Sequence, residues 1–382
     1  MISDSAEVVI VGGGVMGTSI AFHLAEAGVR DVVLVERDEL GSGSTCKAAG
    51  GVRAQFSDEL NIQLGARSLE AFKRFSERPG QEIDLHQVGY LFLLSDPAHV
   101  EAFERNVALQ NSLGVPSRMI SVAEARAMSP LISTEGLLAA AYSPDDGHCT
   151  PESVVLGYAT AARRLGARLH THTAVTDILM SGNDITGVVT DRGTIRTNAV
   201  ICTAGVWAPS IGEMVGVDLP VVPLRRQVMF TEPMPSLDPV VPFTIDFAST
   251  FYFHREGRGL LFGMSDPEET PGFKLDVSDA WMPRLTAAIE KRAPSLLDVG
   301  VRTGWAGLYE VSPDHNAIIG ESRGVSRFLY ATGFSGHGFL QGPAVGEIIR
   351  DLYLERAPMF DVSSLDVTRF AADETRPELN VV

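Results

Sequence analysis

The sequence has little material for a disulfide framework, a metal centre or a polyanion-binding surface. Its 382 residues include three cysteines, whose odd number and wide spacing predict neither disulfide pairs nor a metal site. They are Cys46, Cys149 and Cys202. Lysine is equally scarce, so arginine supplies most of the 31 basic residues. Because 48 acidic residues set the net charge at −17 and no basic cluster offsets them, we expect neither a nucleic-acid partner nor an anionic membrane surface.

Long apolar runs are also missing. No stretch reaches the roughly 18 consecutive apolar residues of a membrane span, and the first residues lack the basic start of a signal peptide. Together with the cysteine usage, this favours a reducing compartment, and we expect a cytoplasmic protein. In contrast, 45% of the residues are hydrophobic, which is enough for a large core. The length predicts roughly two to three domains.

A glycine-rich turn near the N-terminus predicts a dinucleotide site. Gly12, Gly14 and Gly17 form a G-x-G-x-x-G motif between a short β-branched strand and a helical segment. Such glycines allow a tight turn, a close approach of the backbone to a pyrophosphate and close packing of the helix on the strand. Glu36 ends the next strand, where its carboxylate can accept hydrogen bonds from ribose hydroxyls.

Three further segments rich in small residues suit a long cofactor. They are residues 41–53, 199–205 and 330–339. Small residues leave room for a ligand along the backbone, and their spread over the chain fits FAD better than a simple NAD site.

These segments resemble the D-amino-acid oxidase-like FAD enzymes, and within them the sarcosine oxidase group of β-subunits and monomeric enzymes. The resemblance runs from about residue 6 to residue 356, and its most specific motif is Gly333–Phe339. Asp145-Asp146-Gly147 and Ser312-Pro313-Asp314 are further landmarks of the group.

The resemblance implies an α/β (α+β) fold in which a Rossmann-like FAD-binding domain is assembled from discontinuous segments. We expect residues 1–84, 143–218 and 313–360 to form this domain. An inserted, mostly antiparallel β-sheet domain for the substrate would comprise residues 85–142 and 219–312. The polar C-terminal tail, residues 361–382, is expected to be loosely held.

The same resemblance, with the glycine motif, implies that FAD is held by four regions of the chain. Val175 is expected to contact the adenine through its backbone, and the loop at Gly336 to face the flavin. The expected cofactor-binding residues are Gly12, Gly14, Val15, Met16, Gly17, Glu36, Arg37, Ser44, Thr45, Ala49, Gly50, Gly51, Val175, Ala204, Gly205, Gly333, Gly336, His337, Gly338, Phe339 and Leu340.

Four side chains are candidates for the chemistry. Arg53 resembles the arginine that binds the substrate carboxylate, and its planar guanidinium suits that role; the alternative is a solvated or structural arginine. Tyr252 either directs its hydroxyl toward the substrate or packs as an ordinary residue of the sheet. His337 is an electrostatic or positioning group rather than an obligate base. Lys47 is either a loop residue in solvent or a cation beside the flavin. No metal is expected.

The sequence departs from the monomeric sarcosine oxidases at three places. Gly307 stands where they carry the cysteine that links the flavin, which excludes a thioether at that position. Leu340 replaces a carboxylate-binding lysine, and Leu260 or Leu261 replaces a lysine associated with oxygen activation. We therefore expect slow reaction with O₂ unless Lys47 substitutes.

Together these features predict an FAD-dependent oxidoreductase for the C–N bond of a small secondary or N-methylated amino acid, such as sarcosine or proline. The expected reaction is hydride transfer to flavin N5, followed by hydrolysis of the imine, with O₂ or another carrier as electron acceptor. One alternative is a glycine or D-amino-acid oxidase of the same fold. Another is a β-type subunit that is active only with a partner chain.

Overall fold

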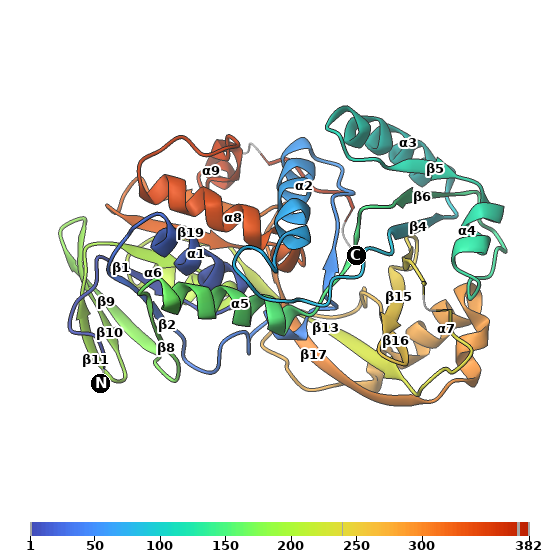
Figure 1. The fold of residues 1–382 in the computed structure, drawn as a ribbon, viewed down its shortest axis with the longest axis horizontal. Helices are drawn as coiled ribbons and strands as arrows, with labels where there is room; N and C mark the ends of the chain where they lie inside the picture. The colour runs from blue at the N-terminus through green and yellow to red at the C-terminus, as the bar shows by residue number, and fades with distance from the viewer. Residues whose placement is uncertain (1, 239, 373–374, 381–382) are drawn as a thin grey trace.

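The computed structural model describes residues 2–238, 240–372 and 375–380. The chain forms two lobes, each built around one large β-sheet (Figure 1). Helices cover the sheet of the first lobe, and the second lobe carries its helices on the side away from the first. The expected mixed fold, with a Rossmann-like parallel sheet and a second, mostly antiparallel sheet, is confirmed.

The first lobe contains a six-stranded sheet in the order β18-β19-β12-β1-β2-β8. Its strands are β1 (Val8–Val11), β2 (Val32–Val35), β8 (Arg168–His170), β12 (Val200–Cys202), β18 (Ile318–Glu321) and β19 (Phe328–Thr332). Neighbouring strands of this sheet run parallel, except that β18 and β19 are antiparallel to each other. Val8 and Ile10 belong to one apolar core and Val9 and Val11 to another, so β1 is buried on both faces and reads as a continuous apolar run.

Helices and a small sheet cover the two faces of this parallel sheet. One face packs on α1 (Val15–Glu26), α2 (Glu59–Lys73), α5 (Pro151–Arg164) and α8 (Gly338–Tyr353). The other face packs on α6 (Ala208–Glu213) and on the antiparallel strands β9 (Val175–Ser181), β10 (Asp184–Thr190) and β11 (Gly193–Arg196). The strands of the parallel sheet meet the second lobe at their carboxyl ends, where open α/β sheets bind ligands.

The second lobe contains an eight-stranded sheet in the order β17-β13-β16-β15-β14-β4-β6-β5. Its strands are β4 (Tyr90–Leu94), β5 (Arg118–Ile120), β6 (Ala139–Ser143), β13 (Val222–Thr231), β14 (Phe243–Asp246), β15 (Phe251–Glu256), β16 (Gly259–Gly263) and β17 (Val301–Val311). Only β14 and β4 run parallel. The accompanying helices are α3 (Pro97–Ser112), α4 (Val122–Met128) and α7 (Met282–Arg292).

Short elements connect the lobes and close the chain. The two-stranded pair β3 (Gly51–Val52) and β7 (Gly147–His148) lies where the chain crosses between the lobes. The remaining elements are single turns and one short helix, η1 (Thr45–Lys47), η2 (Gly205–Trp207), η3 (Asp279–Trp281), η4 (Pro294–Asp298), η5 (Ser363–Leu365) and α9 (Arg369–Ala372). Of the helices formed by the described residues, none is long and apolar enough to cross a membrane.

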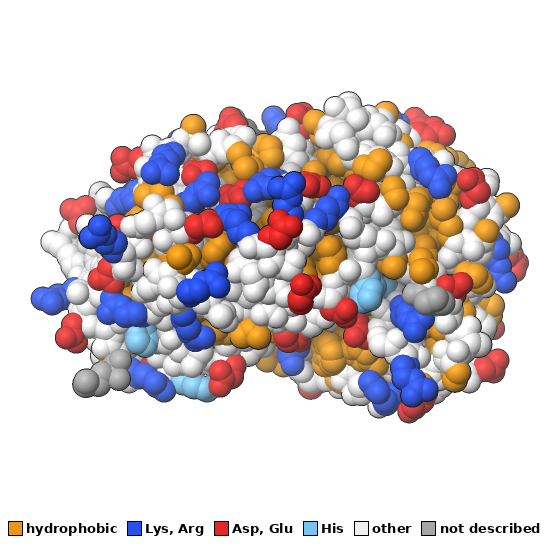
Figure 2. Space-filling model, viewed as in Figure 1, with side chains coloured by type: hydrophobic (Ala, Val, Ile, Leu, Met, Phe, Trp, Pro, Cys, Tyr) orange, Lys and Arg blue, Asp and Glu red, His pale blue; other side chains and the backbone are white. Residues whose placement is uncertain are grey.

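The surface differs between the lobes on the face that Figure 2 shows. Lysine and arginine side chains gather over the first lobe, and apolar side chains are more frequent over the second (Figure 2).

Arg67 of α2 pairs with Glu347 of α8 at 2.6 Å, and Arg78 pairs with Glu26 of α1 at 2.5 Å. These ion pairs join the helices that cover one face of the parallel sheet.

The described part of the C-terminal tail is docked, so the expectation of a loosely held tail is wrong there. Arg369 donates two hydrogen bonds to the carboxylate of Asp314, at 2.8 and 2.9 Å. Glu378 is 1% exposed and accepts a hydrogen bond of 2.6 Å from the Ser57 hydroxyl. The polar composition predicted an exposed tail, whereas these polar groups are buried and hydrogen-bonded to matching partners. Residues 373–374 and 381–382 of the predicted tail lie outside the described part of the chain.

Candidate active site

One cavity of about 480 Å³ extends between the two lobes. It begins at the carboxyl ends of β1, β2 and β12 and reaches the face of the eight-stranded sheet. The lining brings together segments from all four regions that the sequence singled out. Nineteen of the predicted cofactor-binding residues line it, namely Gly12, Gly14, Val15, Met16, Glu36, Arg37, Ser44, Thr45, Ala49, Gly50, Gly51, Val175, Ala204, Gly205, Gly336, His337, Gly338, Phe339 and Leu340.

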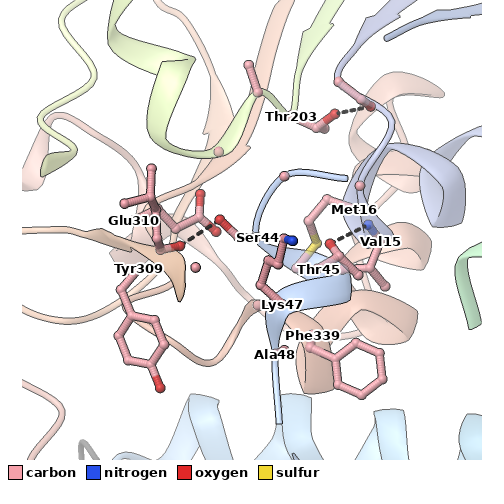
Figure 3. Close-up of a pocket in the computed structure, with 18 of the residues that line it drawn as sticks. Val15, Met16, Ser44, Thr45, Lys47, Ala48, Thr203, Tyr309, Glu310 and Phe339 are labelled. Atoms are coloured by element: carbon pink, nitrogen blue, oxygen red, sulfur yellow. Dashed lines mark hydrogen bonds between the residues drawn. The ribbon is translucent and has the colours of Figure 1, made fainter. Parts of the chain in front are cut away.

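The glycine turn between β1 and α1 is tightly constrained. Gly12 has φ +114°, and a Cβ atom there would lie 2.4 Å from the carbonyl oxygen of Thr203. A Cβ at Gly17 would lie 1.9 Å from the carbonyl oxygen of Gly12, although Gly17 itself does not line the cavity. Gly14 precedes α1 and offers no side-chain cap, so the first-turn amides of Met16 and Gly17 remain for an anionic ligand. The Thr45 hydroxyl accepts a hydrogen bond of 3.1 Å from the Val15 amide (Figure 3).

Glu36 is fixed at the edge of the cavity by backbone amides. Its carboxylate accepts hydrogen bonds from Gly13 N at 2.7 Å and from Asp38 N at 2.9 Å. A carboxylate held in this way can accept hydrogen bonds from ribose hydroxyls and repels an additional phosphate. Arg37 lies over the ring of Trp207, 3.7 Å from its centroid, and forms a flat wall beside this end of the cavity.

The loop after β2 is attached to both lobes. The Ser44 hydroxyl donates a hydrogen bond of 2.6 Å to Leu308 O, and Trp305 Nε1 donates one of 3.1 Å to Lys47 O. Figure 3 shows the Lys47 amino group pointing between Glu310 and Met16. A Cβ at Gly307 would lie 2.6 Å from Lys47 Cβ, so a larger residue at position 307 would displace Lys47.

Cys46 is not placed to attach a cofactor. It does not line the cavity, and its Sγ lies so close to Gly41 that a Cβ there would approach within 2.4 Å. Burial raises the pKa of the Cys46 thiol to about 12, so the reactive thiolate is disfavoured.

The loop before α8 forms the opposite wall. Gly336 has φ +98°, and a Cβ there would lie 2.4 Å from the ring of Tyr309. Burial, followed by the positive charge of Arg53, holds the pKa of His337 well below its usual range, so the imidazole is neutral. Gly333, a predicted cofactor residue, does not line the cavity and instead donates its amide hydrogen bond to Glu310 at 3.3 Å.

All four predicted catalytic candidates line the cavity: Arg53, Tyr252, His337 and Lys47. Arg53 is 4% exposed and follows β3. Asp146, of the Asp-Asp-Gly landmark, accepts a hydrogen bond of 3.0 Å from the next amide, Ala54 N, and thereby fixes this segment.

Three tyrosine rings on the face of the eight-stranded sheet each pack closely against a glycine. A Cβ at Gly51 would lie 1.8 Å from Tyr90 Oη, and one at Gly263 would lie 2.5 Å from Tyr252 Oη. Tyr309 packs in the same way against the loop at Gly336. The three rings therefore give the second-lobe side of the cavity an aromatic surface that carries phenol hydroxyl groups. Packing of the three rings therefore requires glycine at these points.

Several residues of the cavity were not predicted from the sequence, and those with polar side chains that bear on the chemistry include Tyr90, Arg226, Tyr309 and Glu310. Glu310 accepts a hydrogen bond of 3.1 Å from the Thr332 hydroxyl, and burial raises its pKa to about 7. A period-two pattern on β13 and β17 could have placed Arg226 and Tyr309 on one face of the sheet.

His148, His254 and Glu256 form a cluster with ligand atoms within 4.8 Å of one another. The two ring nitrogens of His254 face backbone carbonyl oxygens, those of Arg255 at 2.8 Å and Ala49 at 2.9 Å. This histidine serves to hold the loop at Ala49 and has no nitrogen directed at a metal.

The cavity fits FAD in shape and in donors. It is continuous from the first-turn amides and Glu36 to the aromatic sheet face, and the backbone approaches it closely where Cβ atoms are absent. A pyrophosphate would take the amides at α1, and a ribose the Glu36 carboxylate. The flat ring system would lie toward Lys47 and Gly336, between the two lobes.

Comparisons with known proteins agree with this assignment. Residues 7–352 match a family model described as FAD dependent oxidoreductase. Mitochondrial dimethylglycine dehydrogenase of Rattus norvegicus is 32% identical over 96% of this chain and 45% of its own length. Mitochondrial sarcosine dehydrogenase of Mus musculus is 30% identical over 98% of this chain and 42% of its own length. The chain thus spans less than half the length of these relatives.

A solved structure matches over its whole length. The crystal structure of L-proline dehydrogenase from P. horikoshii superposes with a TM-score of 0.93 at 34% sequence identity. The match covers 98% of this chain and 100% of that one.

Proposed function

The chain belongs to the DAO family of FAD-dependent oxidoreductases, and from this premise we propose that it oxidises the C–N bond of a small secondary or N-methylated amino acid. FAD is its cofactor, and the resemblance to D-amino-acid oxidase-like enzymes is confirmed. One observation carries the proposal: a single cavity joins the dinucleotide turn at Gly12 to a face with two arginines and three tyrosines. The substrates for which its relatives are named, dimethylglycine, sarcosine and proline, share a carboxylate and a secondary or tertiary amine.

The cations in the cavity select the charge of the substrate. Lys47, Arg53 and Arg226 line it, so a carboxylate is attracted and an ammonium group is repelled. The amine therefore binds neutral, with its lone pair available to assist loss of hydride from the adjacent carbon. When bound, FAD supplies the oxidant that accepts this hydride equivalent.

No residue has to act as a strong base in this scheme. His337 is neutral, but its Nε2 faces a guanidinium nitrogen of Arg53 at 3.4 Å, so it orients Arg53 rather than abstracting a proton. Tyr252 and Tyr309 bound the pocket and exclude water from the reacting carbon. The imine product is then hydrolysed by water.

A dye-linked assay of the purified chain tests this function. Sarcosine, dimethylglycine, proline, glycine and a D-amino acid are compared, and secondary and N-methylated substrates are expected to give the highest kcat/KM. Gel filtration of the active sample tests the alternative of a subunit that needs a partner. A monodisperse, flavin-loaded chain without turnover on any of these amines would favour that alternative.

A further inference from the structure

Arg226 occupies the substrate side of the cavity on the central part of β13. In the antiparallel register Arg226 pairs with Gly307 and Leu224 with Tyr309, so Arg226 and Tyr309 lie on neighbouring strands. The Arg226 guanidinium carbon is 5.1 Å from the centroid of the Tyr309 ring. Val228, two residues further along β13, also lines the cavity, which places Arg226 on the inner face of the sheet.

The hydrogen-bonding groups of Arg226 are largely unused. Its Nη1 donates a hydrogen bond of 3.2 Å to the carbonyl oxygen of Arg225, and its buried Nε has no partner. No ion pair within the described ranges includes Arg226, whereas the adjacent Arg225 pairs with Glu269 at 2.7 Å. A buried guanidinium donor without a partner, on an arginine that lines a cavity, is suited to bind an anion.

In contrast to Arg226, Arg53 uses its guanidinium nitrogens in hydrogen bonds within the protein. Its Nη1 donates to the carbonyl oxygen of Gln55, and its Nη2 donates to Asn380 O at 2.7 Å and faces His337 Nε2 at 3.4 Å. Phe56 covers its guanidinium, with the ring centroid 4.2 Å from the central carbon. Both terminal guanidinium nitrogens of Arg53 therefore already donate hydrogen bonds to backbone carbonyl oxygens of the protein. A carboxylate that bound both nitrogens would have to displace the Asn380 carbonyl.

Tyr252 adds a hydroxyl beside Arg226. Its ring crosses Gly263, and Gly263 pairs with Val228 of β13. The Tyr252 hydroxyl thus reaches the strand that carries Arg226, and the positive charge of Arg226 acts on the Tyr252 hydroxyl. An arginine and a phenol on the same face of the sheet make a complementary cradle for one carboxylate.

We propose that Arg226, assisted by Tyr252, binds the carboxylate of the substrate, and that Arg53 positions the C-terminal segment instead. This inference rests on the proposed function, since it identifies which cation of that site recognises the acid. It differs from the assignment that the family resemblance gives to Arg53.

The test is a binding titration of the FAD-loaded enzyme with methoxyacetate, an unreactive carboxylate, followed by the change in flavin absorbance. Methoxyacetamide is the neutral probe of the same shape. The variants are Arg226→Gln, Arg226→Lys and Arg53→Gln, and Arg302→Gln is the matched control because Arg302 is exposed on β17. FAD content is measured for each variant.

Arg226→Gln is expected to weaken methoxyacetate binding at least about 30-fold while methoxyacetamide binding and FAD content stay unchanged. Arg226→Lys should recover little, because a point charge lacks the fork. Arg302→Gln should change the methoxyacetate Kd by less than about fivefold, and the loss in Arg53→Gln should be clearly smaller than that in Arg226→Gln.

Three results would overturn the inference. They are an unchanged Kd in Arg226→Gln with a large loss in Arg53→Gln, loss of FAD from Arg226→Gln, and equal losses for the acid and the amide. If carboxylate binding depends on Arg226 but no secondary amine reduces the flavin, the proposed function fails and the inference stands.

Discussion

Arg53 Nη2 donates a hydrogen bond of 2.7 Å to the backbone carbonyl of Asn380, a contact between residues 327 positions apart in the chain. The contact attaches the C-terminal segment to Arg53, which itself lines the cavity. Glu378 secures the same segment, because its carboxylate accepts hydrogen bonds from Ser57 and from Asn61 Nδ2 at 3.0 Å. The loop at Arg53 and the C-terminal segment therefore stabilise one another.

Arg53→Met should release this segment. The substitution leaves the buried carbonyl oxygen of Asn380 without its donor, and that of Gln55 with only a long hydrogen bond of 3.5 Å from Asn380 Nδ2, which costs about 1–3 kcal/mol of unfolding free energy. Hydrogen exchange should show faster exchange around Glu378, and Arg53→Lys should restore little because lysine has no fork. Unchanged exchange at Glu378, together with a loss confined to kcat/KM for carboxylate substrates, would identify Arg53 as the carboxylate ligand.

Glu36→Ala should weaken FAD retention by about 1–3 kcal/mol, since it removes the acceptor for the ribose hydroxyls and releases the Gly13 amide. Isothermal titration of the apoprotein with FAD measures the effect. Glu39→Ala is the matched control, because Glu39 is an exposed acid on the same loop whose partner is His172. Equal FAD affinity for the folded Glu36→Ala variant and the control would mean that other residues hold the adenosine half.

The reaction of the reduced enzyme with O₂ is the next test, with Lys47 as the candidate cation beside the flavin. Leu260, Leu261 and Leu340 are each at most 6% exposed and provide no charge, so we expect reoxidation of the reduced enzyme by O₂ to be slow and a dye or quinone to be preferred. Stopped-flow mixing with aerated buffer checks this expectation. Fast reoxidation that collapses in Lys47→Met but not in Lys73→Met, the control outside the cavity, would contradict it and assign oxygen activation to Lys47.

Glu310 should make stability fall as the pH rises. Burial raises its pKa from 4.5 to about 7 in the folded protein, so below about pH 4.5 it is protonated in both states and contributes nothing. As the pH rises toward about 7, the unfolded chain loses the proton first and unfolding becomes easier. Asp146, whose pKa burial also raises to about 7, acts in the same direction.

Glu310→Gln removes one of these contributions while Asp146 is retained. Chemical denaturation at about pH 5 and about pH 8 should therefore show a smaller loss of stability for the variant than for the wild type. The difference is expected to reach up to about 3 kcal/mol, set by the pKa shift. An identical pH dependence for the two proteins would show that Glu310 is ionised in the fold.

The local part of the fold was accessible from the sequence, and the distant part was not. The first strand, the glycine turn, the following helix and Glu36 lie within one short stretch, so their spacing predicts the nucleotide end of the cavity. The order of the eight-stranded sheet depends on pairings such as that of Arg226 with Gly307, which lie far apart in the chain. Without that register, nothing in the sequence distinguishes Arg226 from Arg225, although only Arg226 lines the cavity.

The docked tail was missed for a related reason. Its polar residues indicate exposure when they are considered alone, and only the fold supplies their partners: Asp314 for Arg369, and Ser57 and Asn61 for Glu378. The Ser-Pro-Asp landmark at Asp314 thus has a structural role that its position in a family motif does not reveal.

The most direct measurement is anaerobic mixing of the FAD-loaded enzyme with single amino acids, followed by bleaching of the oxidised flavin band. The account predicts rapid, stoichiometric bleaching by at least one of sarcosine, dimethylglycine and proline, and much slower bleaching by the corresponding amides, which lack the carboxylate. Failure of every secondary and N-methylated amino acid to bleach the flavin, or equal rates for acids and amides, would contradict it.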